Sequence, residues 1–208
     1  MTVYRFGDTE ASEVIVQAID ERSLPAIDEE VRILCELTCR KPCVTVVTVD
    51  DWFNDLSPWK APAVFGKDPF GDGAGQTLGF ISDLCNDSRK DYYLGGYSLS
   101  GLFALWAGYQ TDIFKGIAAA SPSMWFPGFA DYMADHQIRC NSVYLSLGDR
   151  ESKTKNKVMA TVGDCIQSAH ELLVSRGVNC RFEWNSGNHF ADVEKRCARA
   201  FAWVLEAT

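Results

Sequence analysis

One serine of the sequence lies between a short apolar stretch and a longer one, in DYYLGGYSLSGLFALWAGY. We expect Tyr92–Tyr97 to form a strand and a helix to begin near Leu99, which places Ser98 in the sharp turn between them. The residues two before and two after it, Gly96 and Ser100, are small, as the close approach of strand and helix requires. The unpaired N–H groups at the start of that helix favour negative charge near the serine. The pattern predicts a nucleophile, and its alternative is a tight turn without a catalytic role.

A serine hydroxyl becomes a good nucleophile when a base takes its proton, and histidine is the usual base. The sequence contains three histidines. His136 lies near the end of one expected helix and His170 in the middle of another, whereas His189 follows the last expected strand, in NSGNHF. Because the carboxyl ends of parallel strands meet at one edge of a sheet, we expect His189 to be the base for Ser98.

The histidine in turn needs a carboxylate on its second ring nitrogen, which orients the ring and stabilises its charged form. The turn GDRE, after the expected strand Ser142–Leu147, offers two candidates, Asp149 and Glu151. We prefer Glu151 because its longer side chain can reach across to an imidazole, whereas a turn residue such as Asp149 often accepts backbone N–H groups. The resulting chain order of serine, acid and histidine is that of the α/β-hydrolases.

Strands alternate with helices along the whole chain, and these elements must bring the three side chains together. The expected strands cover residues 3–6, 14–19, 44–49, 92–97, 116–120, 142–147 and 180–184. The expected helices begin near residues 27 and 99 and cover residues 76–86, 129–138, 157–175 and 191–206. This alternation predicts a single α/β domain, residues 1–208, with a mostly parallel central sheet and helices on both faces. Val44–Val49 is apolar at nearly every position, which predicts a strand in the middle of the sheet.

The composition is that of a folded domain and disfavours some partners. With 208 residues, 47% of them hydrophobic, the chain can bury a substantial single core. A formal net charge of -8 argues against binding to nucleic acid or to an anionic membrane, since both attract basic surfaces. The N-terminus lacks a basic start followed by a long apolar run, so we expect a cytoplasmic protein.

The eight cysteines are the unusual feature of the composition. The expected compartment disfavours disulfides, and the absence of any CxxC pair disfavours a zinc site. We therefore expect free thiols that are buried as small hydrophobic side chains.

A long irregular segment, residues 50–75, is rich in proline, glycine and aromatic residues, and such long loops are usually functional. Its end, GDGAGQ, has the spacing GxGxG instead of GxGxxG and follows no strand, which disfavours dinucleotide binding. We expect this segment and the aromatic loop 121–129 to form the substrate site. Trp59, Trp125 and Phe126 are the candidate lining residues, with ordinary packing as the alternative role of each.

Four motifs together make the sequence resemble a known family. They are GGYSLSGLFAL, SPSMWF, LSLGDRE and GNHF, and the resemblance runs from about residue 44 to the C-terminus. The sequence resembles the esterases of the α/β-hydrolase superfamily that include esterase D and the enterochelin-esterase-like enzymes. This resemblance implies an α/β-hydrolase fold in which Ser98 is the nucleophile, Glu151 the acid and His189 the base.

The same resemblance implies an oxyanion hole, the group of N–H donors that binds the charged oxygen of the reacting carbonyl. One donor would be the N–H of Leu99, and the second an N–H in the loop after the 44–49 strand, at Asp51 or Trp52. The sequence departs from the family at Ser100, where the family usually has glycine. The chain is also short, so we expect little room for the separate lid that many hydrolases carry.

These observations together predict a serine esterase or related acyl hydrolase that cleaves a small-molecule ester or thioester through an acyl-enzyme. We expect it to need no metal and no organic cofactor. One alternative is a catalytically inactive protein of the same fold that binds a small molecule or a protein, and another is a nucleotide-binding α/β protein. The sequence leaves the oligomeric state open.

Overall fold

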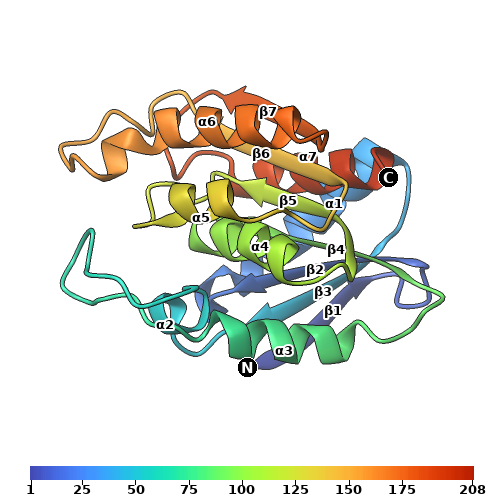
Figure 1. Cartoon of the computed structure of the whole chain (residues 1–208). Coiled ribbons are helices and arrows are strands. Elements are labelled where there is room, and N and C mark those ends of the chain that lie inside the picture. The colour runs from blue at the N-terminus through green and yellow to red at the C-terminus, as the bar shows by residue number, and fades with distance from the viewer.

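A computed structural model describes all 208 residues, and its elements form one central sheet with helices on either side (Figure 1). The seven strands are β1 (Thr2–Gly7), β2 (Glu13–Ile19), β3 (Cys43–Thr48), β4 (Asp91–Tyr97), β5 (Phe114–Ala120), β6 (Ser142–Gly148) and β7 (Asn179–Asn185). Their spatial order is β1-β3-β2-β4-β5-β6-β7. The edge strand β1 pairs antiparallel with β3, and every other pair is parallel. The carboxyl ends of six parallel strands therefore share one edge of the sheet.

The helices form two layers, one on each face of the sheet. They are α1 (Ile27–Thr38), α2 (Trp52–Asp55), α3 (Ala74–Leu84), α4 (Leu99–Gln110), α5 (Phe129–Asp135), α6 (Val162–Ser175) and α7 (Val193–Glu206), with short 3-10 helices η1 (Glu21–Ala26) and η2 (Met159–Thr161). The core on one face includes α3, α4, α5 and α6, and the core on the other includes α1 and α7. Figure 1 shows these two groups in front of and behind the sheet. None of the helices is both long and apolar enough to span a membrane.

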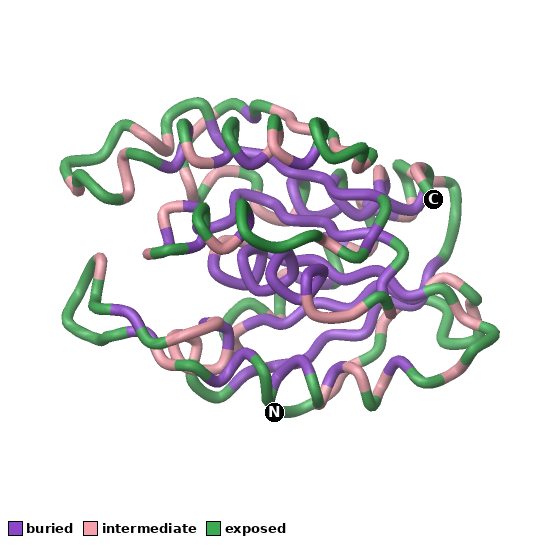
Figure 2. Tube along the Cα trace, viewed as in Figure 1, coloured by how far each residue is buried: buried purple, intermediate pink, exposed green.

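The helix α4 lies in the centre of the fold, where Figure 2 shows a continuous buried region. Every residue from Leu99 to Tyr109 is buried, which explains why this part of the sequence is mostly apolar and carries no charged residue. The helix packs closely on β4. A Cβ atom on Gly96 would lie 2.0 Å from Ser100 Oγ, so no larger residue fits at that position without movement. Small residues in the turn thus allow the strand and the helix to meet at Ser98.

The structure corrects three sequence-based expectations about the elements. All six residues of β3 are buried, as predicted, but β3 is the second strand from the edge, and the middle position belongs to β4. The reason is that the antiparallel edge strand β1 covers β3, and no local pattern encodes that pairing. The helix expected over 129–138 ends at Asp135, and the region 157–175 divides into η2 and α6.

All eight cysteines are free thiols in the structure. Four of them are buried, as expected, namely Cys43, Cys85, Cys140 and Cys197. The expectation is wrong for Cys39, which is exposed and caps the end of α1 in a left-handed conformation, with φ 53°.

Candidate active site

The turn after β4 holds Ser98 in a conformation that few residues adopt. Its backbone has φ 60° and ψ -121°, outside the regions that are favourable for a residue with a side chain. Three hydrogen bonds hold this backbone. The N–H of Ser98 donates to Ala120 O (3.2 Å), and its carbonyl accepts from the N–H groups of Leu102 and Ser123 (3.1 Å each). Such strain costs about 1–3 kcal/mol and persists only where the surroundings fix it, as they do here.

The structure brings Ser98, His189 and Glu151 together at the carboxyl edge of the sheet. Ser98 Oγ lies 3.0 Å from His189 Nε2, and His189 Nδ1 lies 2.6 Å from Glu151 Oε2. The three residues follow β4, β7 and β6, so strand order and direction create the cluster from distant parts of the chain. The Glu151 side chain is 4% exposed and the His189 side chain 31% exposed, which leaves the imidazole open to solvent on one side. Their catalytic roles stay predictions.

The two carboxylates of the GDRE turn have different contacts, and these decide between them. Asp149 Oδ1 accepts the N–H of Gly187 (2.8 Å), and its side chain is 53% exposed. It therefore stabilises the backbone between two loops, the alternative considered for it. Glu151 is the carboxylate that contacts the imidazole. Its other oxygen, Oε1, accepts the Gly148 N–H (2.7 Å) and the Ser121 hydroxyl (2.8 Å).

The surroundings of Glu151 keep its carboxyl in the ionised form. Burial alone would raise its pKa, but the hydrogen bond and charge of His189 oppose this, together with hydrogen bonds from Gly148 and Ser121, and the net pKa lies below its ordinary value. An ionised carboxylate is the form that stabilises a protonated imidazole. The arrangement can therefore support proton transfer from Ser98 to His189.

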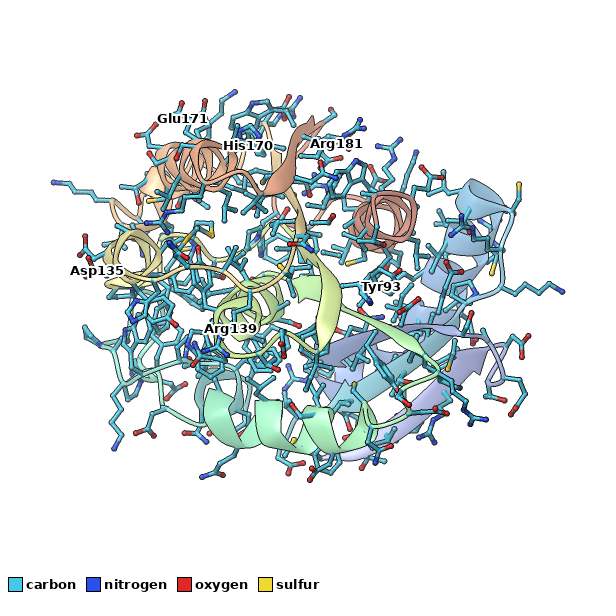
Figure 3. All side chains as sticks on the ribbon, turned by 45° about the vertical axis from the view of Figure 1, so that its right-hand side comes forward. Tyr93, Asp135, Arg139, His170, Glu171 and Arg181 are labelled. Carbon is cyan, nitrogen blue, oxygen red and sulfur yellow. The ribbon has the colours of Figure 1, made fainter.

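The other two histidines lie elsewhere and bond to backbone. His170 Nε2 lies 3.3 Å from Cys180 O, and its ring packs against Phe182 of β7. Figure 3 shows His170 on α6 and Arg181 on the neighbouring strand β7. His136 Nδ1 lies 2.9 Å from Tyr132 O, with its ring stacked on that of Tyr132.

The sequence-based reasoning missed two residues of this cluster, Tyr97 and Arg196. The Tyr97 hydroxyl donates to the carbonyl of His189 (2.8 Å) and accepts from Arg196 Nη1 (2.9 Å). Arg196 also pairs with Glu151 at 3.1 Å. A signal for Arg196 existed, because the apolar spacing of the last helix places position 196 on the same face as Val193 and Ala200. An arginine on a buried face needs an anionic partner.

The two expected oxyanion donors have different positions. Leu99 is the first residue of α4, so its N–H has no partner within the helix and lies directly after Ser98. Trp52 opens α2 after β3, and β2 lies between β3 and β4. The loop after β2, where η1 begins at Glu21, is therefore the nearer neighbour of the Ser98 turn. The side chain of Trp52 lines a cavity of about 320 Å³ together with Tyr97 and Ser100.

The residues expected to line the substrate site lie where the segment 50–75 contacts the loop 121–129. Trp59 Nε1 donates to Pro127 O (2.9 Å), and its ring packs against Phe126, so it joins the segment 50–75 to the loop 121–129. Phe126 is 2% exposed and belongs to the core, so the packing alternative holds for it. Trp125 is partly buried against the core. In the same loop, Ser123 Oγ lies 3.4 Å from Ser98 Oγ.

The segment 50–75 also forms a hollow of its own. It has a volume of about 860 Å³ and is lined by Phe53, Lys60, Phe70 and neighbouring residues. The structure has no group of three or more His, Cys, Asp or Glu side chains placed to hold a metal ion.

Comparison with solved structures identifies the fold. The siderophore hydrolase EstA of Aspergillus nidulans aligns with 97% of this chain, and the alignment covers 86% of the EstA chain, with a TM-score of 0.70 and 19% identity. An IroE-like serine hydrolase of Shewanella oneidensis aligns with 93% of this chain and over 70% of its own chain (TM-score 0.74, 16% identity). A Bacillus cereus carboxylesterase aligns with 100% of this chain and over 95% of its own chain (TM-score 0.64, 15% identity). No protein-family model matches the chain, and no curated protein does.

These likenesses establish the class of fold. The chain has the α/β-hydrolase fold, as the sequence predicted, and its structural neighbours are esterases and serine hydrolases. At identities below 20% the likeness extends to the fold and no further, so the chemistry must be argued from the side chains of this chain.

Proposed function

We propose that this protein is a serine hydrolase that cleaves a carboxylic ester or thioester of a small molecule. The observation that carries the proposal is the continuous chain of contacts from Ser98 Oγ through the His189 ring to Glu151, located at a strained turn before a buried helix. Nucleophile, base and orienting acid in hydrogen-bond reach of one another are the arrangement that acyl transfer requires. The fold of its esterase neighbours supports the same class of reaction.

The reaction would proceed in two stages. His189 Nε2 takes the proton of Ser98 as its oxygen attacks the carbonyl carbon, and Glu151 stabilises the imidazolium that forms. His189 then gives the proton to the leaving alcohol or thiol, and Ser98 keeps the acyl group. In the second stage a water molecule attacks the acyl-enzyme with His189 again as base, which releases the acid and restores the serine.

The negative charge on the carbonyl oxygen needs backbone donors. The N–H of Leu99 is the first, because it follows the nucleophile at the start of α4. For the second, we retain Trp52 and add the N–H groups of Glu21 and Arg22, which open η1 directly after β2. The position of β2 beside β4 favours the η1 donors.

We propose that the ester carries an apolar or aromatic portion. Phe190 is 84% exposed and lies edge-on to the ring of His189, at 5.4 Å between centroids. Trp59 and Trp125, in the two aromatic loops, are further candidate contacts. EstA of A. nidulans is described as a siderophore hydrolase, so esters of that class belong in a substrate screen. The cytoplasmic location expected from the sequence remains part of this proposal.

Turnover on a panel of aryl esters, alkyl esters and thioesters tests the proposal. Ser98→Ala should lower kcat by about 10³ to 10⁶ fold, because the nucleophile is removed while the fold is kept. Ser88→Ala is the matched control, since Ser88 is an exposed serine in the connection before β4 and should leave kcat unchanged. Full activity of Ser98→Ala would contradict the mechanism. Absence of turnover on the whole panel would instead favour the binding protein of the same fold.

A further inference from the structure

The last helix carries a buried cation. Arg196 of α7 is 2% exposed, although arginine is among the residues least often fully buried. A charge in that position is costly unless an anion and hydrogen-bond acceptors surround it. The acceptors of this guanidinium come from three different parts of the candidate active site.

The contacts of Arg196 join those parts to one another. Nη1 lies 3.1 Å from Glu151 Oε1, the oxygen that faces away from His189. The same nitrogen donates to the Tyr97 hydroxyl at 2.9 Å, and that hydroxyl donates to the carbonyl of His189. Nη2 donates to Ser186 O at 3.0 Å, at the start of the loop that bears His189. Arg196 thus contacts the acid, the residue before the nucleophile and the base-bearing loop.

The charge of Arg196 also matters for Glu151. When His189 is neutral, the buried carboxylate has no other cation within contact distance, and an unpaired buried carboxylate tends to take up a proton. A protonated Glu151 could no longer stabilise an imidazolium. Because arginine stays charged at any physiological pH, it provides a permanent partner for the carboxylate through the reaction cycle.

We propose that Arg196 is a positioning residue for the hydrolase reaction, which holds Glu151 ionised and aimed at His189 and fixes the His189 loop against the Ser98 turn. The expected effect on kcat/KM rests on the proposed function. The expected effect on the titration of His189 rests on the geometry alone, so the two effects can be tested separately.

Removal of the cation should make the Glu151–His189 pair easier to protonate. The titratable and charged groups that face Glu151 are His189 from its loop, Arg196 from α7 and Tyr97 from β4, with Asp149 in its own turn. Burial raises the pKa of Tyr97 to about 12, so its hydroxyl stays neutral at working pH. Loss of a cation at this distance should move the titration of the pair upward by about one pH unit.

The experiment is an NMR titration of the His189 ring, together with the pH dependence of kcat/KM, in Arg196→Met and Arg196→Lys. The chain has three histidines, and His189→Gln assigns the signal of interest. In Arg196→Met the midpoint of the His189 titration and the acid limb of kcat/KM should both move up by about one unit, which is tenfold in rate at a fixed pH on that limb. Arg196→Lys should keep the wild-type midpoint because it keeps the charge. Its kcat should be lower, because an ammonium group cannot make both guanidinium hydrogen bonds, to the Tyr97 hydroxyl and to Ser186 O.

Arg199→Met is the matched control, because Arg199 is an exposed arginine of the same helix and should leave both midpoints unchanged. A folded Arg196→Met protein with the wild-type His189 midpoint would overturn the inference and leave Arg196 a structural residue. If Arg196→Met does not fold, Arg196→Gln, which removes the charge and keeps a hydrogen-bond donor, carries the same test: an upward shift of its His189 midpoint supports the inference, and the wild-type midpoint overturns it. The NMR readout is independent of turnover, so absence of esterase activity in the wild type would overturn the proposed function and not this inference.

Discussion

Two glutamates of this protein have carboxyl groups that are shielded from solvent, and these groups behave in opposite ways. Glu30 of α1, between β2 and α7, is 4% exposed as a whole residue, whereas Glu151 is partly exposed as a residue but has a side chain that is only 4% exposed. Burial raises the pKa of Glu30 from 4.5 to about 8, despite a hydrogen bond of 2.7 Å from Gln17 Nε2. The pKa of Glu151 is lowered. The comparison teaches that the partners of a shielded carboxyl help to determine whether it is charged.

The partners differ in charge and in number. Glu30 has the neutral amide of Gln17 and the neighbouring thiol of Cys197, which cannot compensate an anion. Glu151 has an imidazole that can become charged, a guanidinium, a backbone N–H and a serine hydroxyl. The region around Glu30 therefore serves packing with a neutral acid, and the region around Glu151 holds an anion ready to stabilise charge.

The largest expected effect is on kcat, and it should appear when Glu151 is neutralised but not when Glu30 is. Glu151→Gln should lower kcat by about 10³ to 10⁴ fold, because an amide cannot stabilise the His189 imidazolium. Glu30→Gln should change kcat far less, since the hydrogen bond of Glu30 to Gln17 involves none of Ser98, His189 and Glu151. Asp149→Asn serves as a control within the GDRE turn and should keep most of the activity. Steady-state kinetics on one ester decide the comparison, and equal losses in Glu30→Gln and Glu151→Gln would break it.

A smaller effect is expected on stability, with opposite dependence on pH. The folded protein favours protonated Glu30, so that stabilisation is complete below about pH 4.5 and is lost as the pH rises toward 8. Glu30→Gln, which mimics the neutral form, should therefore gain stability relative to wild type, from about 1 kcal/mol at pH 5 to about 4 kcal/mol at pH 8. For Glu151 the stabilisation is present above its unfolded pKa and is lost as the pH falls through its lowered folded pKa. Urea unfolding at several pH values measures both, and parallel curves for wild type and Glu30→Gln would contradict the assignment.

Sequence reasoning predicted most of the fold because local patterns encode the elements. The seven strands and the start of α4 at Leu99 follow from apolar runs and turn residues. The position of β3 was wrong, because strand order depends on pairing between distant segments. The second oxyanion donor, expected at Asp51 or Trp52, stays a prediction, and the loop after β2 is the one that borders β4.

The sequence predicted those residues of the candidate site that directly follow a strand. Ser98, Glu151 and His189 were found because each stands at a strand's carboxyl end. Arg196 was missed because it lies in a helix, where an arginine is usually solvated. For Phe126 the sequence left lining and packing open, because an aromatic loop residue looks the same in sequence whether it faces a substrate or the core, and its burial favours packing.

The reactivity of Ser98 is the claim from which the rest follows, and covalent labelling measures it most directly. A fluorophosphonate should modify the wild-type protein at one site, which peptide mapping by mass spectrometry locates at Ser98. His189→Gln should lose this labelling, because the hydroxyl then has no base at 3.0 Å. Labelling at another serine, or undiminished labelling of Ser98 in His189→Gln, would contradict the account.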